Sequence, residues 1–226
     1  MNAPAPMTFF YSLRSPYAWL AWRLLCQYLP PAELERIALA PFWEPEPAML
    51  SRLEEARTPF LYRPMSRERH FYILGDVRRL ARHLGYGVAF PGEARAGGWD
   101  LPHHACLAVP AVAARALIGR LFAARWEEGR DISDPAVVDS VLAELGLPQR
   151  SADLAGDALQ QQAFAALQKT HANQVFGVPF FTVGRERFWG VDRLPFALAA
   201  AGLPWRDLAG AWLHGAAPAA ATVASC

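Results

Sequence analysis

The spacing of apolar residues changes twice along this chain, and these changes constrain the fold more than any other feature. The segment "MTFFYSL", from Met7, is a short apolar and aromatic run bounded by turn residues, as in a buried strand. The following "YAWLAWRLLCQYL" has helical spacing and stops before Pro30 and Pro31, and "ERIALAPFW" predicts a second strand that ends at Pro41. Strand, helix and strand at this length predict a βαβ unit.

Residues 58–172 have a helical period throughout. The segments "SRERHFYILGDVRRLARHLG" and "DLAGDALQQQAFAALQKTHANQ" predict one helix each. The long apolar segment "HHACLAVPAVAARALIGRLFAARWEEG" also predicts helix, and Pro110 must kink it or divide it. In "DISDPAVVDSVLAELG", Asp134 suits an N-cap, Pro135 the first helical position and Gly146 the end.

The strand period returns near the C-terminus. The segment "GVPFFTVGRERFWG" predicts two short strands with a turn near Gly184, and "VDRLPFALAAAG" predicts a closing helix. A βαβ start and a ββα finish predict one α/β sheet interrupted by a helical block. We therefore assign residues 7–57 and 173–213 to a discontinuous sheet domain and 58–172 to an all-helical insertion. The small, low-complexity residues 214–226 predict a disordered tail.

Composition argues against several classes of partner. The chain has 22 basic and 21 acidic residues, so its net charge of +1 gives no reason to expect nucleic acid or an anionic membrane. No apolar run reaches the ~20 residues that a membrane span needs, and the N-terminus lacks a secretory pattern. The three cysteines form no C-x-x-C pair, and adjacent His103 and His104 cannot share one helical face, so we predict no metal site. A cytoplasmic location fits these features.

The stretch "RSPY" places Ser15 and Pro16 at the start of the first predicted helix. Serine followed by proline there is typical of an N-cap, and most such pairs are only caps. The same position also ends the first strand of an open α/β sheet, where free backbone N–H groups and the helix end favour an anion. A thiolate bound there would be stabilised. On the residues alone, both interpretations stay open.

The stretch "FGVPFF" places Pro179 at the entrance of a strand that should be central. Proline cannot donate a hydrogen bond to a neighbouring strand. A cis Val178–Pro179 bond would resolve this and turn the Val178 backbone toward the site. The alternative is a trans proline at the first position of an edge strand, which is the commoner isomer.

Three stretches together resemble a known family. The segments "FFYSLRSPYAWLA", "GRDISDP" and "VFGVPFFTVGRERFWGVDRL" are similar to the 2-hydroxychromene-2-carboxylate isomerases. Those enzymes are relatives of the kappa-class glutathione transferases, within the thioredoxin-like group typified by the DsbA oxidoreductases. The resemblance covers roughly residues 7–202. It implies a thioredoxin-like domain split by a helical insertion.

The resemblance also implies roles for single residues. Dithiol relatives open this helix with C-P-x-C, whereas residues 15–18 here are Ser-Pro-Tyr-Ala, so disulfide exchange at this helix is excluded. Ser15 would hold the sulfur of glutathione, and the Val178 backbone before Pro179 would pair with its cysteinyl unit. Asp192 and Arg193 would bind the γ-glutamyl group through opposite charges.

The implied activity is a glutathione-dependent isomerisation. The glutathione thiolate would add to the conjugated ring of an aromatic-derived carboxylate, the ring would open, a bond would rotate, and the thiolate would leave. Two alternatives stay open: a kappa-like glutathione transferase, and a non-catalytic thioredoxin-fold protein that binds a ligand or partner. A homodimer is a family-level expectation.

Further residues are candidates for substrate binding. Arg14, where the family has an apolar residue, either favours an anionic ligand or points to solvent. Tyr17 follows the serine, and Arg69 and Tyr72 lie at helical spacing on the insertion, where a plain helix surface is the alternative. We expect Trp189 to be a core residue. Two asparagines that are frequent in the family have no counterpart in "EEARTPFLYRP" and "WDLPHHACLA".

Overall fold

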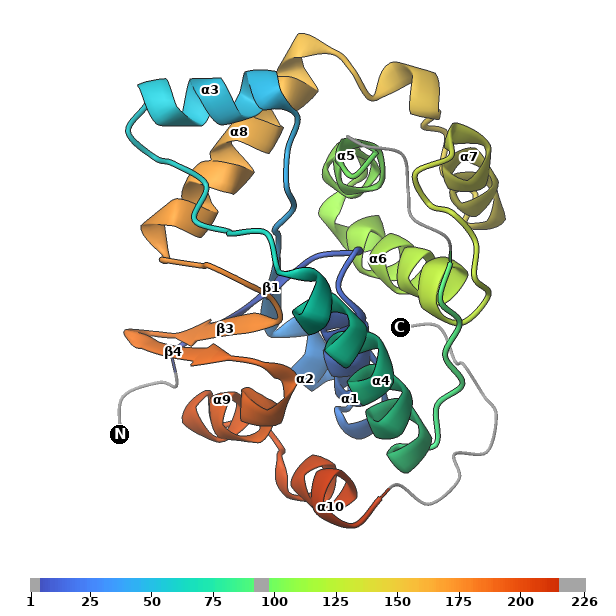
Figure 1. The fold of residues 1–226 in the computed structure, drawn as a ribbon, viewed down its shortest axis with the longest axis vertical. Helices are drawn as coiled ribbons and strands as arrows, with labels where there is room; N and C mark the ends of the chain where they lie inside the picture. The colour runs from blue at the N-terminus through green and yellow to red at the C-terminus, as the bar shows by residue number, and fades with distance from the viewer. Residues whose placement is uncertain (1–4, 92–97, 216–226) are drawn as a thin grey trace.

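The computed structural model describes residues 5–91 and 98–215 (Figure 1). The strands are β1 (Met7–Tyr11), β2 (Ile37–Pro41), β3 (Phe180–Val183) and β4 (Glu186–Trp189). The helices are α1 (Pro16–Tyr28), α2 (Pro31–Glu35), α3 (Pro47–Glu55), α4 (Arg67–His83), α5 (Asp100–Ala108), α6 (Ala111–Trp126), α7 (Pro135–Glu144), α8 (Asp157–Ala172), α9 (Leu194–Ala200) and α10 (Arg206–His214), with 3-10 turns η1 (Ser151–Asp153) and η2 (Val191–Arg193).

The four strands form one mixed sheet in the order β2-β1-β3-β4. Strand β1 runs parallel to β2 and antiparallel to β3, with Phe9 opposite both Leu39 and Phe181. The β3–β4 hairpin turns at Gly184, as predicted. Figure 1 shows α3 and α5 to α8 gathered above the sheet, whereas α9 and α10 lie below it. The predicted α/β fold, a βαβ start and a ββα finish around helices, is confirmed.

The two faces of the sheet carry separate apolar clusters because side chains alternate along each strand. On one face Phe9 stacks on Phe181, with ring centroids 5.1 Å apart, within the large core that includes α1 and α9. On the other face Phe10 meets the edge of Phe180 at 6.4 Å and packs with Val175. Each fully buried aromatic side chain contributes roughly 2 kcal/mol to folding, so both faces anchor β1 and β3.

The helix boundaries follow the signals in the sequence. Ser15 caps α1, whose buried face includes Trp19, and the helix ends before the two prolines. Pro110 was predicted to kink or divide the long apolar helical segment. It divides the segment into α5 and α6. The Asp134 side chain accepts a hydrogen bond from the backbone N–H of Ala136, and Gly146 adopts a left-handed φ of 67° beyond the end of α7.

Three helices were not predicted: α2, α3 and α10. Helix α2 has only five residues, and its last residue, Glu35, lies in the segment predicted as the second strand. Helix α3 is only nine residues long and buries only Met49 and Leu53, too few positions to define a period. Helix α10 buries only Leu208 and Ala211, and it includes His214, so the predicted tail began one residue too early. Residues 216–226 of that predicted tail lie outside the described residues. Across the described ranges, no helix is long and apolar enough to cross a membrane.

Candidate functional site

Ser15 joins two distant parts of the chain through one hydroxyl group. Its Oγ accepts a hydrogen bond from the Ala18 N–H at 3.2 Å, which confirms the predicted cap. The same hydroxyl donates to the Val178 carbonyl at 3.3 Å. The Ser15 side chain therefore lies where the N-terminal end of α1 meets the segment that enters β3.

The Val178–Pro179 peptide bond is cis, the less common of the two predicted isomers. The Pro179 carbonyl accepts a hydrogen bond from the Gly190 N–H at 2.9 Å, which fixes the hairpin behind it. The Val178 N–H donates no hydrogen bond to any atom of residues 5–91 and 98–215. A half-buried backbone donor and the Val178 carbonyl thus stand together beside Ser15.

Asp192 and Arg193 lie on η2, which packs against α1. Their side chains pair at 2.7 Å, and each is about half exposed. Gly190 precedes them with a φ of 103°, and a Cβ added there would lie 2.5 Å from the Asp192 Oδ1. Glycine is therefore required for this turn, which presents a carboxylate and a guanidinium side by side.

Tyr17 links the first turn of α1 to α4. Its hydroxyl donates to the Asp76 carboxylate at 2.7 Å. Burial and this neighbouring carboxylate both raise the pKa of Tyr17, so the phenol stays protonated. Tyr72 is mostly exposed, and its hydroxyl lies 3.5 Å from the same carboxylate. Both tyrosines predicted to bind substrate therefore meet at Asp76 of α4, and Tyr17 lies two residues after Ser15.

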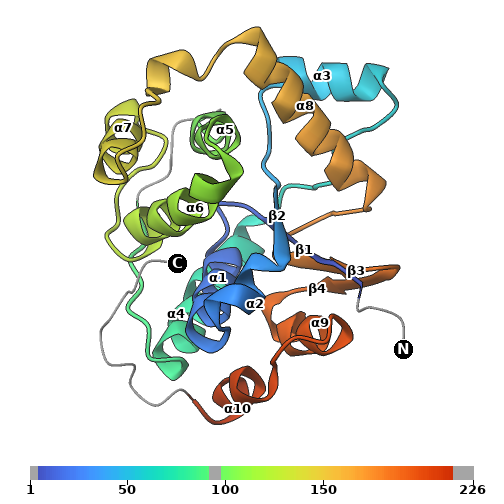
Figure 2. The same cartoon turned by 180° about the vertical axis from the view of Figure 1, so that it is seen from behind.

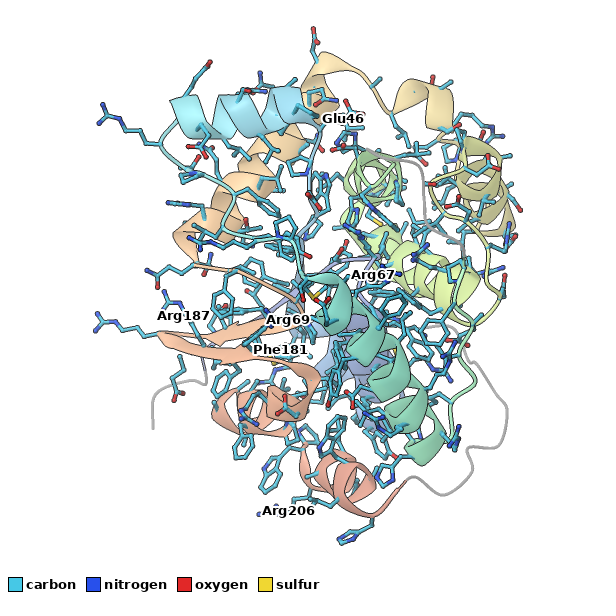
Figure 3. The ribbon with its side chains drawn as sticks, in the orientation of Figure 1. Glu46, Arg67, Arg69, Phe181, Arg187 and Arg206 are labelled. Atoms are coloured by element: carbon cyan, nitrogen blue, oxygen red, sulfur yellow. The ribbon has the colours of Figure 1, made fainter. Side chains whose placement is uncertain are left out.

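Arg14 and Arg69 carry positive charge to the same neighbourhood. The Arg14 guanidinium pairs with Glu44 at 3.1 Å and lies 5.4 Å from the ring centre of Trp99. Arg69 is on the exposed first turn of α4, where Figure 3 labels it. Burial raises the pKa of Tyr62, whereas Arg14 and Arg69 both lower it, so both guanidinium groups lie near this phenol. The structure thus brings together two predicted substrate-binding arginines.

Sequence reasoning missed two side chains that hold the turn before Ser15. His103 of α5 accepts a hydrogen bond from the Leu13 N–H at 3.1 Å. Trp126 of α6 donates its indole N–H to the Leu13 carbonyl at 3.0 Å. Both side chains are buried, and no local pattern distinguishes them from ordinary core residues.

The prediction that Trp189 belongs to the core is wrong. This side chain is 51% exposed, and its ring meets that of Phe176 with centroids 4.9 Å apart. Trp189 ends β4, which lies at the edge of the sheet and whose residues are exposed or half-buried. Gly177 lets the indole approach, because a Cβ there would lie 3.1 Å from its Nε1. These aromatics flank the cis-proline segment.

Neither of two surface cavities includes Ser15. One of about 500 Å³ lies between α3, α5 and α8, and another of about 360 Å³ lies beside α10. Within the described parts of the chain, no group of three or more His, Cys, Asp or Glu side chains could hold a metal ion. The geometry at Ser15 therefore points to an open binding surface built from backbone groups, a hydroxyl and nearby charges.

A mixed four-stranded sheet, with a capped helix end facing a cis-proline, defines a thioredoxin-fold protein that has no thiol at this helix end. The chain belongs to the DSBA-like thioredoxin domain family, which matches residues 7–201. The predicted family relationship is thereby confirmed at this level. No curated protein matches the chain significantly.

Solved structures share the fold. A 2-hydroxychromene-2-carboxylate isomerase has a TM-score of 0.67 and 24% identity, with 87% of this chain and 94% of that chain covered. The cytosolic disulfide reductase DsbM of Pseudomonas aeruginosa with GSH has a TM-score of 0.55 and 19% identity, covering 92% and 98%. A putative protein disulfide isomerase of Nitrosomonas europaea has a TM-score of 0.57 and 14% identity, covering 94% and 98%.

Proposed function

We propose that this protein is a glutathione-dependent isomerase of the 2-hydroxychromene-2-carboxylate isomerase type, acting on an aromatic-derived carboxylate as a cytoplasmic homodimer. The observation that carries the proposal is the Ser15 hydroxyl beside the Val178 backbone, at a helix end that has no cysteine. The fold shared with an isomerase, and with a reductase whose structure includes GSH, supports it.

The glutathione sulfur would sit at the N-terminal end of α1. There the Ser15 hydroxyl would rotate from the Val178 carbonyl to donate to the thiolate. The positive helix end and this donor both favour the charged form, so they would lower the thiol pKa. The Val178 N–H donates to no acceptor among the residues that the structure describes, and together with its carbonyl it would pair with the cysteinyl backbone.

The remaining charged side chains would bind glutathione and the aromatic carboxylate. Asp192 offers a carboxylate to the γ-glutamyl ammonium, and Arg193 offers a guanidinium to the γ-glutamyl carboxylate. Arg14 and Arg69 would hold the substrate carboxylate on the other side of the sulfur. Tyr17 and Tyr72 would supply ring contacts, since the Tyr17 hydroxyl is committed to Asp76.

A thermal-shift titration with reduced glutathione tests the proposal. A ligand that binds only the folded state must raise the unfolding midpoint, by about 2.7 kcal/mol of stability at 100 times its Kd. We expect a shift of several degrees at millimolar glutathione for the wild type and none for Ser15→Ala. Asp134→Ala is the matched control, because it removes an N-cap of a distant helix. It should lower the midpoint and keep the glutathione shift.

Two outcomes would redirect the assignment. A wild-type midpoint that glutathione leaves unchanged would exclude both glutathione-linked activities and leave a non-catalytic ligand-binding protein. If glutathione binds, the absorbance of a chromene carboxylate separates the two activities. Isomerisation regenerates glutathione and converts the substrate catalytically, whereas a transferase consumes one glutathione per turnover.

A further inference from the structure

Both backbone polar groups of Leu13 are bonded to side chains from helices between β2 and β3. The N–H donates to His103 Nε2, and the carbonyl accepts from the Trp126 indole. Leu13 lies within the turn in which the Ser15 N–H donates to the Ser12 carbonyl at 3.0 Å. Figure 2 shows α6 next to α1, with α5 on the far side of α6. Side chains of α5 and α6 thus fix the backbone of this turn at Leu13, two residues before Ser15.

The hydrogen-bond partners of His103 fix its protonation and tautomer. Its Nδ1 lies 2.6 Å from the Trp99 carbonyl oxygen, which can only accept, so Nδ1 carries the proton. Nε2 must then present a lone pair, and this lone pair accepts from the Leu13 N–H. The ring stacks on Trp43 at 5.1 Å with an interplanar angle of 11°, which prevents rotation. The acceptor is therefore rigid.

His104, the next residue, has none of these relations to the turn. It is almost as buried as His103, and its ring meets that of Trp43 edge-on at 5.9 Å, but its Nδ1 faces the Leu154 carbonyl at 3.2 Å rather than the turn. Its Nε2 lies 3.7 Å from Asp100. The two histidines therefore make a natural comparison, since substitution of either one disturbs the same helix and core.

We infer that His103 is a positioning residue for Ser15. Its neutral imidazole holds the Leu13 peptide, and the rigid turn then sets the direction of the Ser15 hydroxyl toward the Val178 carbonyl and the sulfur site. Without an acceptor for the buried Leu13 N–H, the turn would open to reach water. A displacement of about 1 Å at a reacting group can cost 100-fold in rate.

Hydrogen exchange of the Leu13 amide, measured by NMR, tests the hold on the turn. We expect His103→Leu, which removes the acceptor, to speed this exchange at least about tenfold. His103→Gln supplies an amide oxygen in place of Nε2 and should restore most of the protection. Trp126→Phe removes the second bond and should also speed exchange at Leu13. His104→Leu, the matched control, should lower overall stability without a selective effect on Leu13.

A second readout rests on the proposed function. Glutathione Kd, measured by calorimetry, should rise about tenfold in His103→Leu and stay within about twofold in His104→Leu. With the isomerase substrate, kcat should fall in His103→Leu while the KM for the aromatic carboxylate stays unchanged, because only the sulfur position is affected. His103→Gln should recover both glutathione affinity and kcat.

The two readouts separate failure of this inference from failure of the proposed function. If the wild type binds no glutathione, the proposed function fails, and Leu13 exchange still decides whether His103 holds the turn. If glutathione binds but His103→Leu and His104→Leu have equal Leu13 exchange and equal Kd, His103 is an ordinary core residue and the inference is overturned. Should His103→Leu not fold, His103→Gln and Trp126→Phe give the same comparison.

Discussion

The Ser15 hydroxyl donates a hydrogen bond to the Val178 carbonyl at 3.3 Å, across 163 residues of sequence. These two groups are the ones assigned to the sulfur and to the cysteinyl backbone of glutathione. The hydroxyl and the carbonyl satisfy each other in this structure, and the hydroxyl would rotate to donate to a bound thiolate. A bound thiolate would exchange one acceptor for another and leave no buried polar group without a partner.

Ser15→Cys should create a thiol of unusually low pKa. The helix end and the Ala18 N–H favour a thiolate at this position, so we expect an apparent pKa below about 7.5, against about 8.5 for a free cysteine. The pH dependence of iodoacetamide alkylation measures it, after subtraction of the wild-type rate. Burial raises the pKa of Cys106 to about 12, so that thiol should stay unreactive. An apparent pKa of 8.5 or more would show that the site does not favour anions.

Arg14 and Glu44 should affect substrate affinity far more than stability. Their ion pair is about half exposed, so Glu44→Gln should change the free energy of unfolding by less than about 0.5 kcal/mol. If Arg14 attracts the substrate carboxylate, Glu44→Gln lowers KM and Arg14→Gln raises it, and both effects shrink in high salt. Equal KM values for the three proteins would instead place Arg14 in solvent.

The Tyr17–Asp76 hydrogen bond should be measurable as a coupling free energy. A half-buried phenol donating to a carboxylate at 2.7 Å should contribute about 1 kcal/mol. A double-mutant cycle of Tyr17→Phe and Asp76→Ala, followed by urea unfolding, isolates that pair from the Asp76–Arg79 contact. The same cycle with Tyr72→Phe is the control and should give a coupling near zero, because that contact is long and exposed.

His103 should make the protein less stable in mild acid. Burial lowers its pKa to about 3 from the usual 6.5, so the unfolded state binds a proton between these values while the folded state does not. The contribution of neutral His103 to the free energy of unfolding is fully present above pH 6.5. It is lost progressively as the pH falls toward 3. The loss is about 2 kcal/mol between pH 6.5 and pH 5. Urea unfolding at a series of pH values measures this loss. The free energy of unfolding should fall more steeply with decreasing pH in the wild type than in His103→Gln, and equal pH dependence in the two proteins would contradict the prediction.

Local rules were sufficient to predict much of the fold and the centre of the site. Pro110 predicted the division between α5 and α6, and Pro135 and Gly146 predicted the start and the end of α7. Ser15 was recognisable because a cap is encoded by adjacent residues. The family resemblance supplied its partner, Val178, which no local pattern could bring to Ser15.

Buried contacts between distant segments could not be predicted. His103 and Trp126 act through hydrogen bonds to a backbone peptide more than 80 residues away, and a buried histidine has no distinctive neighbours in sequence. Trp189 was misassigned because its strand is an edge strand, which is a property of the sheet order rather than of the residues. In both cases, contacts between distant segments determined the environment of the side chain, which the local sequence does not specify.

The position of β1 between β2 and β3 has a consequence for synthesis of the chain. Its partner β3 is synthesised only after the whole α3 to α8 segment. One edge of β1 therefore stays unpaired until β3 has left the ribosome. Pairing across so long a loop is slow. An exposed apolar edge of this kind invites association with other chains. We expect nascent chains that stop before β3 to require a chaperone.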